Sequence, residues 1–209
     1  EKLYIGLMSG TSLDGVDGVL VDFSGGRVQV LKHATASLPQ PLRETFHALN
    51  QAGDNELHRA ALAGNALAEV YGAVVRDLLE NSGVSKNRVA AVGAHGQTVR
   101  HLPRIDGGVG YTLQINQPAL LAELCGIDVI ADFRSRDVAA GGQGAPLVPP
   151  FHQAVFGRTG EARAVLNLGG IANVTLLGAE ADAPLIGFDC GPANTLLDLW
   201  CRQHHKGDF

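Results

Sequence analysis

The sequence predicts an α/β fold, in which strand and helix patterns follow one another along a chain of 209 residues. Three apolar stretches with the composition of strands open the chain, at residues 2–8, 16–23 and 28–38. A long amphipathic helix is predicted to begin near Asp54. Residues 90–94 form a short, nearly all-apolar stretch that is typical of a strand buried on both faces. These observations together define the α/β class.

The first elements can be justified in order along the chain. Ser24-Gly25-Gly26 supplies the turn between the second and third strands. Two helices follow, each with apolar residues at helical spacing, and Gly83 is predicted to end the longer one as a C-cap. The apolar positions are Leu42, Phe46 and Leu49 in the first helix and Leu57, Ala61, Ala68, Tyr71, Val74 and Leu78 in the second.

The buried strand at 90–94 leads directly into His95-Gly96-Gln97-Thr98. Sites of α/β proteins collect where strands of this kind end, so these polar residues are candidates for ligand contacts. A helix is then predicted at 118–124, because Pro118 suits a first turn and Gly126 suits a stop. A further strand is predicted at 128–132.

The amino-acid composition of the chain changes after that strand, so we predict a first lobe at residues 1–131 and a second lobe at 132–209. Residues 134–144 are charged and then rich in Ala and Gly. Strands are predicted at 163–168, 173–177 and 185–189, followed by a helix that Pro192 opens. Three strands and one helix are little for a second lobe, so we expect this chain to be the N-terminal part of a longer protein.

Composition limits the function classes. The net charge of −5 argues against nucleic acid or an acidic membrane as partner, because such binding needs clustered Lys and Arg. The three cysteines form no CxxC pair, which fits a reducing compartment. No signal peptide or run of eighteen apolar residues is recognisable, so we predict a cytoplasmic protein without a membrane partner. The histidines lack metal-ligand spacing, and we assign no metal-binding residue.

The stretch from Ser9 to Gly15 is a glycine-bearing turn with hydroxyl groups. Two interpretations are open on spacing alone. Successive backbone N–H groups can form a nest for phosphate, or the polar side chains can satisfy their own hairpin turn. No GK[ST] follows, so the turn is not a P-loop. Asp14 and Asp17 suit either the turn or an indirect contact with Mg²⁺ beside a phosphate.

Asp189 lies in "FDCGPAN", where a strand leads into a helix. It is a candidate general base pointing into a cleft, and the competing interpretation is a helix-capping aspartate. Thr98 and Arg136 are candidate contacts to a substrate, because a hydroxyl suits a sugar and a guanidinium suits a carboxylate. The competing interpretations are a hydrogen-bonded strand end around His95 and a surface ion pair of Arg136 with Asp137.

Five stretches occur in an order that resembles the anhydro-N-acetylmuramic acid kinase family. They are "MSGTSLDGVD", "GAHGQTVRH", "LAELCGIDVIADFRSRDVAAGGQGAPLVPPFHQAVF", "AVLNLGGIANVTLL" and "GFDCGPANTLLD". The resemblance runs from residue 3 to about residue 200. It implies an actin-like ATPase (ribonuclease H-like) fold, with two similar lobes about a nucleotide cleft and the second lobe incomplete in this chain.

The resemblance also implies a reaction. Enzymes of this family open the 1,6-anhydro ring of anhydro-N-acetylmuramic acid with water and phosphorylate O6 from ATP, which gives N-acetylmuramic acid 6-phosphate and ADP in peptidoglycan recycling. ATP and Mg²⁺ are thus the implied cofactors, the amino sugar is the implied substrate, and a homodimer is the implied assembly of the full-length protein. The 209-residue chain alone is expected to have little activity.

Residue roles follow from matching the family's motifs. Asp189 falls on the catalytic aspartate, which deprotonates the attacking water and contacts the substrate. Thr98 and Arg136 fall on substrate contacts. The segment for the ATP phosphates falls on Gly10, Thr11, Ser12, Leu13, Asp14, Gly15, Val16 and Asp17.

This sequence departs from the family pattern in one motif, because Ala193 replaces the second glycine of GPGN. The added methyl group is unfavourable if the position needs a positive φ or close approach of substrate. Two other functions are weighed: a catalytically inactive module that binds a sugar or nucleotide on the same fold, and a kinase of an ordinary amino sugar.

Overall fold

The computed structural model describes residues 3–180 and 182–204. Its contacts divide the chain into two compact units, residues 1–142 and residues 143–209, and each unit is described by itself. Lys2, the first residue of the predicted opening strand, and His205 lie outside the described residues. The α/β class predicted from the sequence is confirmed. The division of the chain into family lobes at 131/132 stays a prediction.

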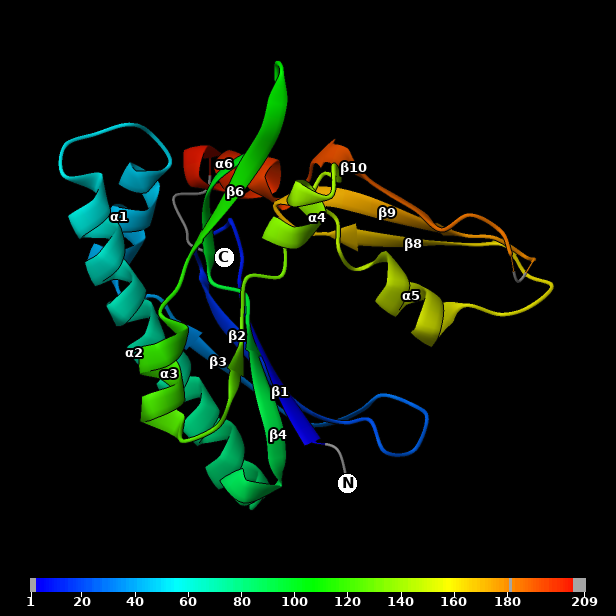
Figure 1. The fold of residues 1–209 in the computed structure, drawn as a ribbon, viewed down its shortest axis with the longest axis horizontal. Helices are drawn as coiled ribbons and strands as arrows, with labels where there is room; N and C mark the ends of the chain where they lie inside the picture. Colours follow the sequence, from blue (N-terminus) through cyan, green and yellow to red (C-terminus); the bar gives the residue numbers. More distant parts are fainter. Residues whose placement is uncertain (1–2, 181, 205–209) are drawn as a thin grey trace. The chain divides into compact units, whose positions relative to one another are not determined.

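The first unit is built on a five-stranded sheet with the order β3-β2-β1-β4-β7 (Figure 1). The first three strands form an antiparallel meander, whereas β1, β4 and β7 run parallel to one another. The carboxyl ends of these three parallel strands therefore meet at one edge of the sheet. The strands are β1 (Leu3–Ser9), β2 (Gly15–Asp22), β3 (Gln29–Ser37), β4 (Val89–Ala94) and β7 (Val129–Ile130).

One face of this sheet is covered by helices, as Figure 1 shows. Side chains alternate along β1, so that Leu3, Ile5 and Leu7 are buried beneath the helices. The long helix α2 packs on β2 and β3, and Gly83 ends it in the left-handed conformation (φ 68°), as predicted. The helices are α1 (Gln40–Leu49), α2 (Glu56–Ser82) and α3 (Pro118–Cys125), with a short 3₁₀ turn η1 (Lys86–Arg88) before β4.

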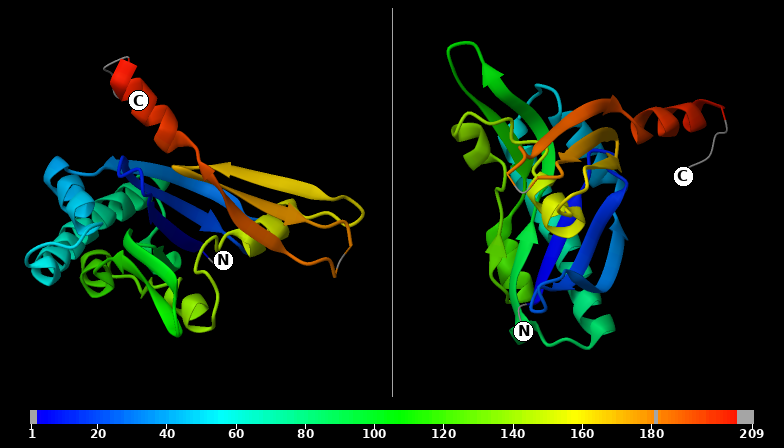
Figure 2. Two further views of the ribbon diagram at one scale, coloured as in Figure 1. Left: turned by 90° about the horizontal axis from the view of Figure 1, so that it is seen from above. Right: turned by 90° about the vertical axis from the view of Figure 1, so that its right-hand side faces the viewer.

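Three elements of the first unit, besides the short 3₁₀ turn η1, were not predicted. Strands β5 (Gln97–Ile105) and β6 (Gly108–Ile115) pair as an antiparallel ribbon, which extends beyond the sheet in both Figure 1 and Figure 2. Most of its residues are exposed or half-buried, so the apolar alternation that marks a strand is weak here. The short helix α4 (Ser135–Ala139) lies in the stretch where we expected only a charged loop.

The second unit is a three-stranded antiparallel sheet with the order β10-β9-β8. Its helices are α5 (Pro149–Phe156), which was not predicted, and α6 (Asn194–His204). Helix α5 packs on one face, where the His152 ring hydrogen-bonds to Thr175 (2.8 Å). The opposite face carries the exposed apolar side chains of Leu166, Leu168, Leu176, Ile186 and Phe188. The strands are β8 (Arg163–Leu168), β9 (Ile171–Leu177) and β10 (Ile186–Pro192).

Gly18 of β2 lies close against helix α2, and this contact can be tested. A Cβ at this position would overlap the side chain of Val74 and lie 3.1 Å from Leu78 Cδ1. We expect Gly18→Ala to destabilise the chain by about 1–3 kcal/mol, because the well-packed core must shift to admit a methyl group. Urea unfolding followed by circular dichroism measures the effect.

Gly25→Ala is the matched control, because a Cβ there meets nothing within 4 Å. A Gly18→Ala variant that unfolds at the same urea concentration as the control would contradict this account of the packing.

Candidate active site

The turn between β1 and β2 is held by its own backbone and by a buried leucine. Leu13 N donates to Gly10 O (3.2 Å), and Leu13 adopts a left-handed conformation (φ 58°). Its side chain is 2% exposed, so the core anchors the turn from below. Thr11 and Ser12 are exposed above it. The turn therefore presents two hydroxyl-bearing residues to solvent on a fixed backbone.

The two aspartates of this stretch have different partners. Asp14 Oδ1 accepts hydrogen bonds from Ser12 Oγ (2.9 Å) and from Gly15 N (3.0 Å). Asp17 lies on β2, and its Oδ1 is 3.4 Å from His33 Nε2 on β3. The two aspartates also line a shallow pocket of about 230 Å³ at the start of β2 and the end of β3. Asp14 thus serves the turn in this structure, as one of the two interpretations held.

A buried hydrogen-bond network joins β1, helix α2 and the end of β4. Tyr71 OH accepts from Gly96 N (3.1 Å) and shares a hydrogen bond with Ser9 Oγ (3.1 Å), which in turn donates to Gly96 O (3.1 Å). Ser9 is 1% exposed and Tyr71 is fully buried. Burial raises the pKa of Tyr71, so its hydroxyl stays protonated. Gly96 needs to be glycine, because its φ is 78° and a Cβ would lie 2.7 Å from Ile115 O.

His95 and Arg134 are brought together from the ends of two parallel strands. Arg134 Nε donates to His95 Nε2 (2.8 Å), and this requires the proton of the neutral ring to lie on Nδ1, which donates to Gly96 O (2.6 Å). Burial is the main cause that lowers the pKa of His95, and Arg134 lowers it further. His95 is therefore a neutral, hydrogen-bonded histidine at a strand end, which was the commoner of the two interpretations.

Arg134 was not singled out by sequence reasoning. It comes after the strand predicted at 128–132, just as His95 comes after the strand predicted at 90–94. The two strands β4 and β7 are parallel neighbours, so polar residues that follow them meet at the carboxyl edge of the sheet. The position of Arg134 after a predicted parallel strand is therefore the feature of the sequence that identifies it as a candidate.

Thr98 and Arg136 lie on neighbouring parts of the first unit. Thr98 follows Gln97 at the start of β5, and its Oγ1 accepts from Gln114 Nε2 on β6 (3.2 Å). Helix α4, which carries the exposed Arg136, packs on β6. Gln97 is 2% exposed, and its Oε1 has no hydrogen-bond partner among the described residues. The structure thus places the predicted substrate contacts beside the carboxyl edge of the sheet.

Asp189 lies within β10 of the second unit and is exposed. It is directly opposite Asn173 of β9, and a β-bulge at Cys190 separates it from the next paired residue. Helix α6 begins at Asn194, five residues later, so the competing interpretation of Asp189 as a helix cap is wrong. The N–H groups of Ala193 and Asn194 instead donate to the carbonyls of Gly170 (2.9 Å) and Gly169 (3.0 Å).

Ala193 does not adopt a positive φ, since the non-glycine residues with positive φ among the described ones are Leu13, Asn55 and Asp132. Its methyl group therefore causes no left-handed strain where the family motif has glycine.

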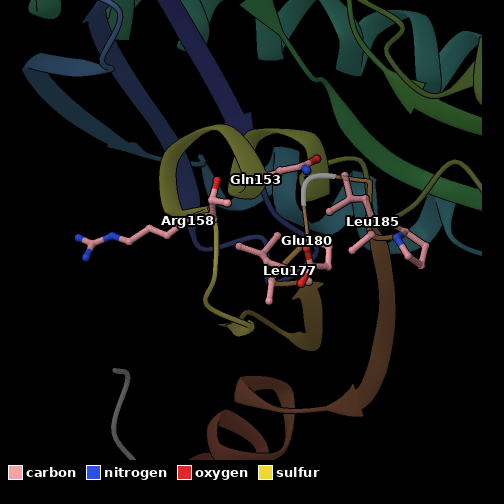
Figure 3. A pocket seen from close by; sticks show the side chains of 11 residues that line it. Gln153, Arg158, Leu177, Glu180 and Leu185 are labelled. Carbon is pink, nitrogen blue, oxygen red and sulfur yellow. The ribbon is translucent and has the colours of Figure 1, made fainter.

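One pocket of the second unit is lined by none of the predicted site residues. It measures about 280 Å³ and lies where helix α5 and the end of β9 meet the connection to β10. In Figure 3, Leu177, Glu180 and Leu185 gather at this pocket, whereas the side chain of Arg158 extends away from them. This pocket therefore does not coincide with Asp189, the candidate general base.

The described part of the chain offers neither a metal-binding cluster nor a membrane-spanning helix. Across residues 3–180 and 182–204, no group of three or more His, Cys, Asp or Glu side chains is placed to hold a metal ion. None of the helices described there has the length and apolarity that a membrane span requires.

The first unit thus has the features of a small-molecule enzyme of the α/β class, with polar groups gathered at the carboxyl ends of parallel strands and a hydroxyl-bearing turn beside them. Comparison with known proteins then identifies the family. A sequence model of the anhydro-N-acetylmuramic acid kinases matches residues 2–209, and the chain belongs to this family. The actin-like ATPase fold expected from the motifs agrees with this membership.

Individual relatives are closely similar. The anhydro-N-acetylmuramic acid kinase of Variovorax paradoxus (strain S110) is 64% identical over 212 residues, which cover 100% of this chain and 56% of the relative. The kinase of Bordetella pertussis (strain Tohama I) is 65% identical over 203 residues, which cover 97% of this chain and 52% of the relative. The chain spans about half the length of the curated relatives it matches.

Solved structures are more distant. A ROK family glucokinase from Streptomyces griseus in complex with glucose and AMPPNP has a TM-score of 0.42 and 17% identity, and the match covers 92% of this chain and 49% of that one. A ROK hexokinase from Thermus thermophilus has a TM-score of 0.41 and 13% identity, and the match covers 88% of this chain and 48% of that one.

The network around Tyr71 yields a prediction on stability. Tyr71→Phe keeps the ring but removes the acceptor of the Gly96 N–H group. An unsatisfied buried donor should lower the free energy of unfolding by about 1–3 kcal/mol. Urea denaturation of Tyr71→Phe and of the control Tyr111→Phe, whose side chain is exposed on β6, tests this. Equal stability of the two variants would refute the role of the network.

His95 should make stability depend on pH. Its pKa is lowered in the folded state, so below about pH 6.5 the unfolded chain takes up a proton that the folded chain resists. This contribution to stability is present above that pH and is lost as the pH falls towards the folded-state pKa. We expect the wild type to lose more unfolding free energy between pH 7.5 and 5.5 than His95→Asn. Parallel losses in the two proteins would show that His95 is not responsible.

Proposed function

We propose that the protein containing this chain is an ATP-dependent anhydro-N-acetylmuramic acid kinase, acting in peptidoglycan recycling. It would open 1,6-anhydro-N-acetylmuramic acid with water and phosphorylate O6, which gives N-acetylmuramic acid 6-phosphate and ADP. The observation that carries the proposal is the family match over residues 2–209, with curated relatives of that name at 60–65% identity.

Asp189 is proposed as the general base. Its carboxylate would take a proton from water as the water oxygen bonds to the anomeric carbon and the bond from that carbon to O6 breaks. The released O6 then forms a bond to the γ-phosphorus of ATP, and ADP leaves. Base assistance of this kind typically contributes about 10²- to 10⁴-fold in rate. The exposed position of Asp189 on a strand, with no cap role, supports this assignment.

The turn from Gly10 to Asp17 is proposed to hold the phosphates of ATP. The structure fits this use, because Thr11 and Ser12 are exposed on a backbone that buried Leu13 fixes. Mg²⁺, carried on the nucleotide, would neutralise phosphate charge. Asp14 and Asp17 are the carboxylates of this segment, and either would be placed for an indirect contact with that ion.

The sugar is proposed to contact Thr98 and Arg136. A threonine hydroxyl both donates and accepts, which suits a sugar hydroxyl. The guanidinium fork of Arg136 suits the lactyl carboxylate that distinguishes muramic acid from glucosamine. Both residues lie beside the carboxyl edge of the first sheet, and Arg136 is exposed on α4.

The assembly and location of the full-length protein also belong to this proposal. We infer a cytoplasmic homodimer that acts on a small sugar and ATP, without a nucleic-acid or membrane partner. The 209-residue chain covers about half of its relatives, so we expect it to lack most activity by itself, since half of a cleft cannot enclose the reactants.

Asp189→Asn in the full-length protein tests the proposed chemistry. The amide cannot accept the proton, so turnover of the anhydro sugar with ATP and Mg²⁺ should disappear while ATP still binds, as measured by product formation and calorimetry. Asp182→Asn, an exposed aspartate of the same unit, is the control and should keep full turnover. Retained turnover in Asp189→Asn would exclude the base assignment.

The same assays separate the two other functions. An inactive binding module would bind ADP or the sugar in the calorimeter without forming product. A kinase of an ordinary amino sugar would place no oxygen-18 from labelled water at the anomeric carbon. For the proposed reaction we expect phosphorylated product that carries the label at that carbon.

A further inference from the structure

Three polar residues form a row across the sheet of the second unit. Asn167 of β8 is directly opposite Asn173 of β9, and Asn173 is directly opposite Asp189 of β10. Directly opposite residues of antiparallel strands share one face, with Cβ atoms about 4.5–5.5 Å apart. The amide of Asn173 is therefore within reach of the Asp189 carboxylate when both side chains turn towards each other.

The carboxamide of Asn173 is unusual in its burial. Its Oδ1 is buried and has no hydrogen-bond partner among the described residues. Buried polar atoms without partners are rare in folded proteins, so each one calls for an explanation. The NH₂ group at the other end of the same amide is a donor and can serve a neighbour in the row. Asp189 is the neighbour whose chemistry matches, because a carboxylate accepts hydrogen bonds.

We propose that Asn173 is a positioning residue for Asp189, donating a hydrogen bond from Nδ2 to its carboxylate when substrate fills the site. The inference rests on the proposed function, since it assigns a partner to the proposed base. The bond would fix which carboxylate oxygen faces the attacking water. It would also favour the ionised form of Asp189, because a hydrogen bond to a carboxylate stabilises its charge. The base would thus be kept ready to accept a proton.

The other titratable or charged side chains around β10 are more remote in the register. On the same face, His152 of α5 is bonded to Thr175, two residues along β9 from Asn173. Arg163 of β8 lies four residues from Asn167, about 13 Å along the strand, and is bonded to Glu161. Helix α6 carries Asp198, Arg202 and His204, and Cys190 follows Asp189 in the bulge. None of these residues is paired directly opposite Asp189 in the sheet, as Asn173 is.

Asn173→Leu in the full-length protein tests the inference. Leucine has a similar volume and removes the unpartnered oxygen, so the variant should fold. Loss of a hydrogen bond to a charged group should lower kcat about 10- to 100-fold, with KM for both substrates nearly unchanged. The acid limb of the pH profile of kcat should move to higher pH, because Asp189 loses a group that stabilises its charge. Asn173→Asp should move it further, since a like charge stands opposite.

Controls assign the shift to this pair. Asn167→Leu makes the same change in the same row, one strand further from Asp189, and should leave the acid limb in place. His152→Asn removes the titratable side chain that α5 places on the same face and should also leave the acid limb in place. Thermal melts establish that each variant is folded. If Asn173→Leu does not fold, Asn173→Asp, which keeps the shape of the side chain, tests the positioning role instead.

The outcomes are distinct. An acid limb and kcat unchanged in the folded Asn173 variants would overturn the positioning role while Asp189→Asn remained inactive, so the proposed function would stand. Turnover retained by Asp189→Asn would overturn the base assignment and the positioning role together.

Discussion

The hydrogen bonds of the Tyr71 hydroxyl hold together the part of the first unit on which the candidate site depends. This group lies on the long helix and contacts Ser9, the last residue of β1, and Gly96, which follows β4. Together with the hydrogen bond from Ser9 Oγ to Gly96 O, it fixes the relative position of the two strand ends. The turn that follows Ser9 and the His95–Arg134 pair are both positioned by this buried network. A tyrosine suits the task because its ring fills the core while its hydroxyl satisfies backbone groups.

The sequence predicted much of this arrangement, for identifiable physical reasons. The meander, the long helix and β4 have strong apolar periodicity, because one side of each is buried in the core. The ribbon of β5 and β6 was not predicted, because most of its residues do not pack on the core and its apolar residues therefore do not alternate clearly. Helix α4 escaped because five residues make little more than one turn. Expected and observed boundaries elsewhere differ by one or two residues, as at β1, except that β10 ends three residues later than expected.

The sequence offered individual candidate residues for the site but not their arrangement in space. Motif resemblance singled out Asp189, yet sequence alone left it between a base and a helix cap. The pairing of β10 with β9 places Asp189 within a strand and so excludes the helix cap. This pairing includes a β-bulge that the sequence pattern does not predict. Arg134 and Asn173 were missed for a related reason. Neither residue is a candidate by itself, because its proposed role depends on a neighbour that only the fold brings close. That neighbour is His95 for Arg134 and Asp189 for Asn173.

The apolar face of the second sheet has a practical consequence. Leu166, Leu168 and Phe188 are about half exposed there, on a sheet whose outer strands β8 and β10 are edges. Exposed apolar patches and open strand edges both promote self-association in solution. Whoever expresses these 209 residues by themselves should therefore plan for poor solubility, for low protein concentrations and for a fusion partner or a longer segment. Turnover is then best measured on the longer protein, where aggregation of the isolated 209 residues does not interfere.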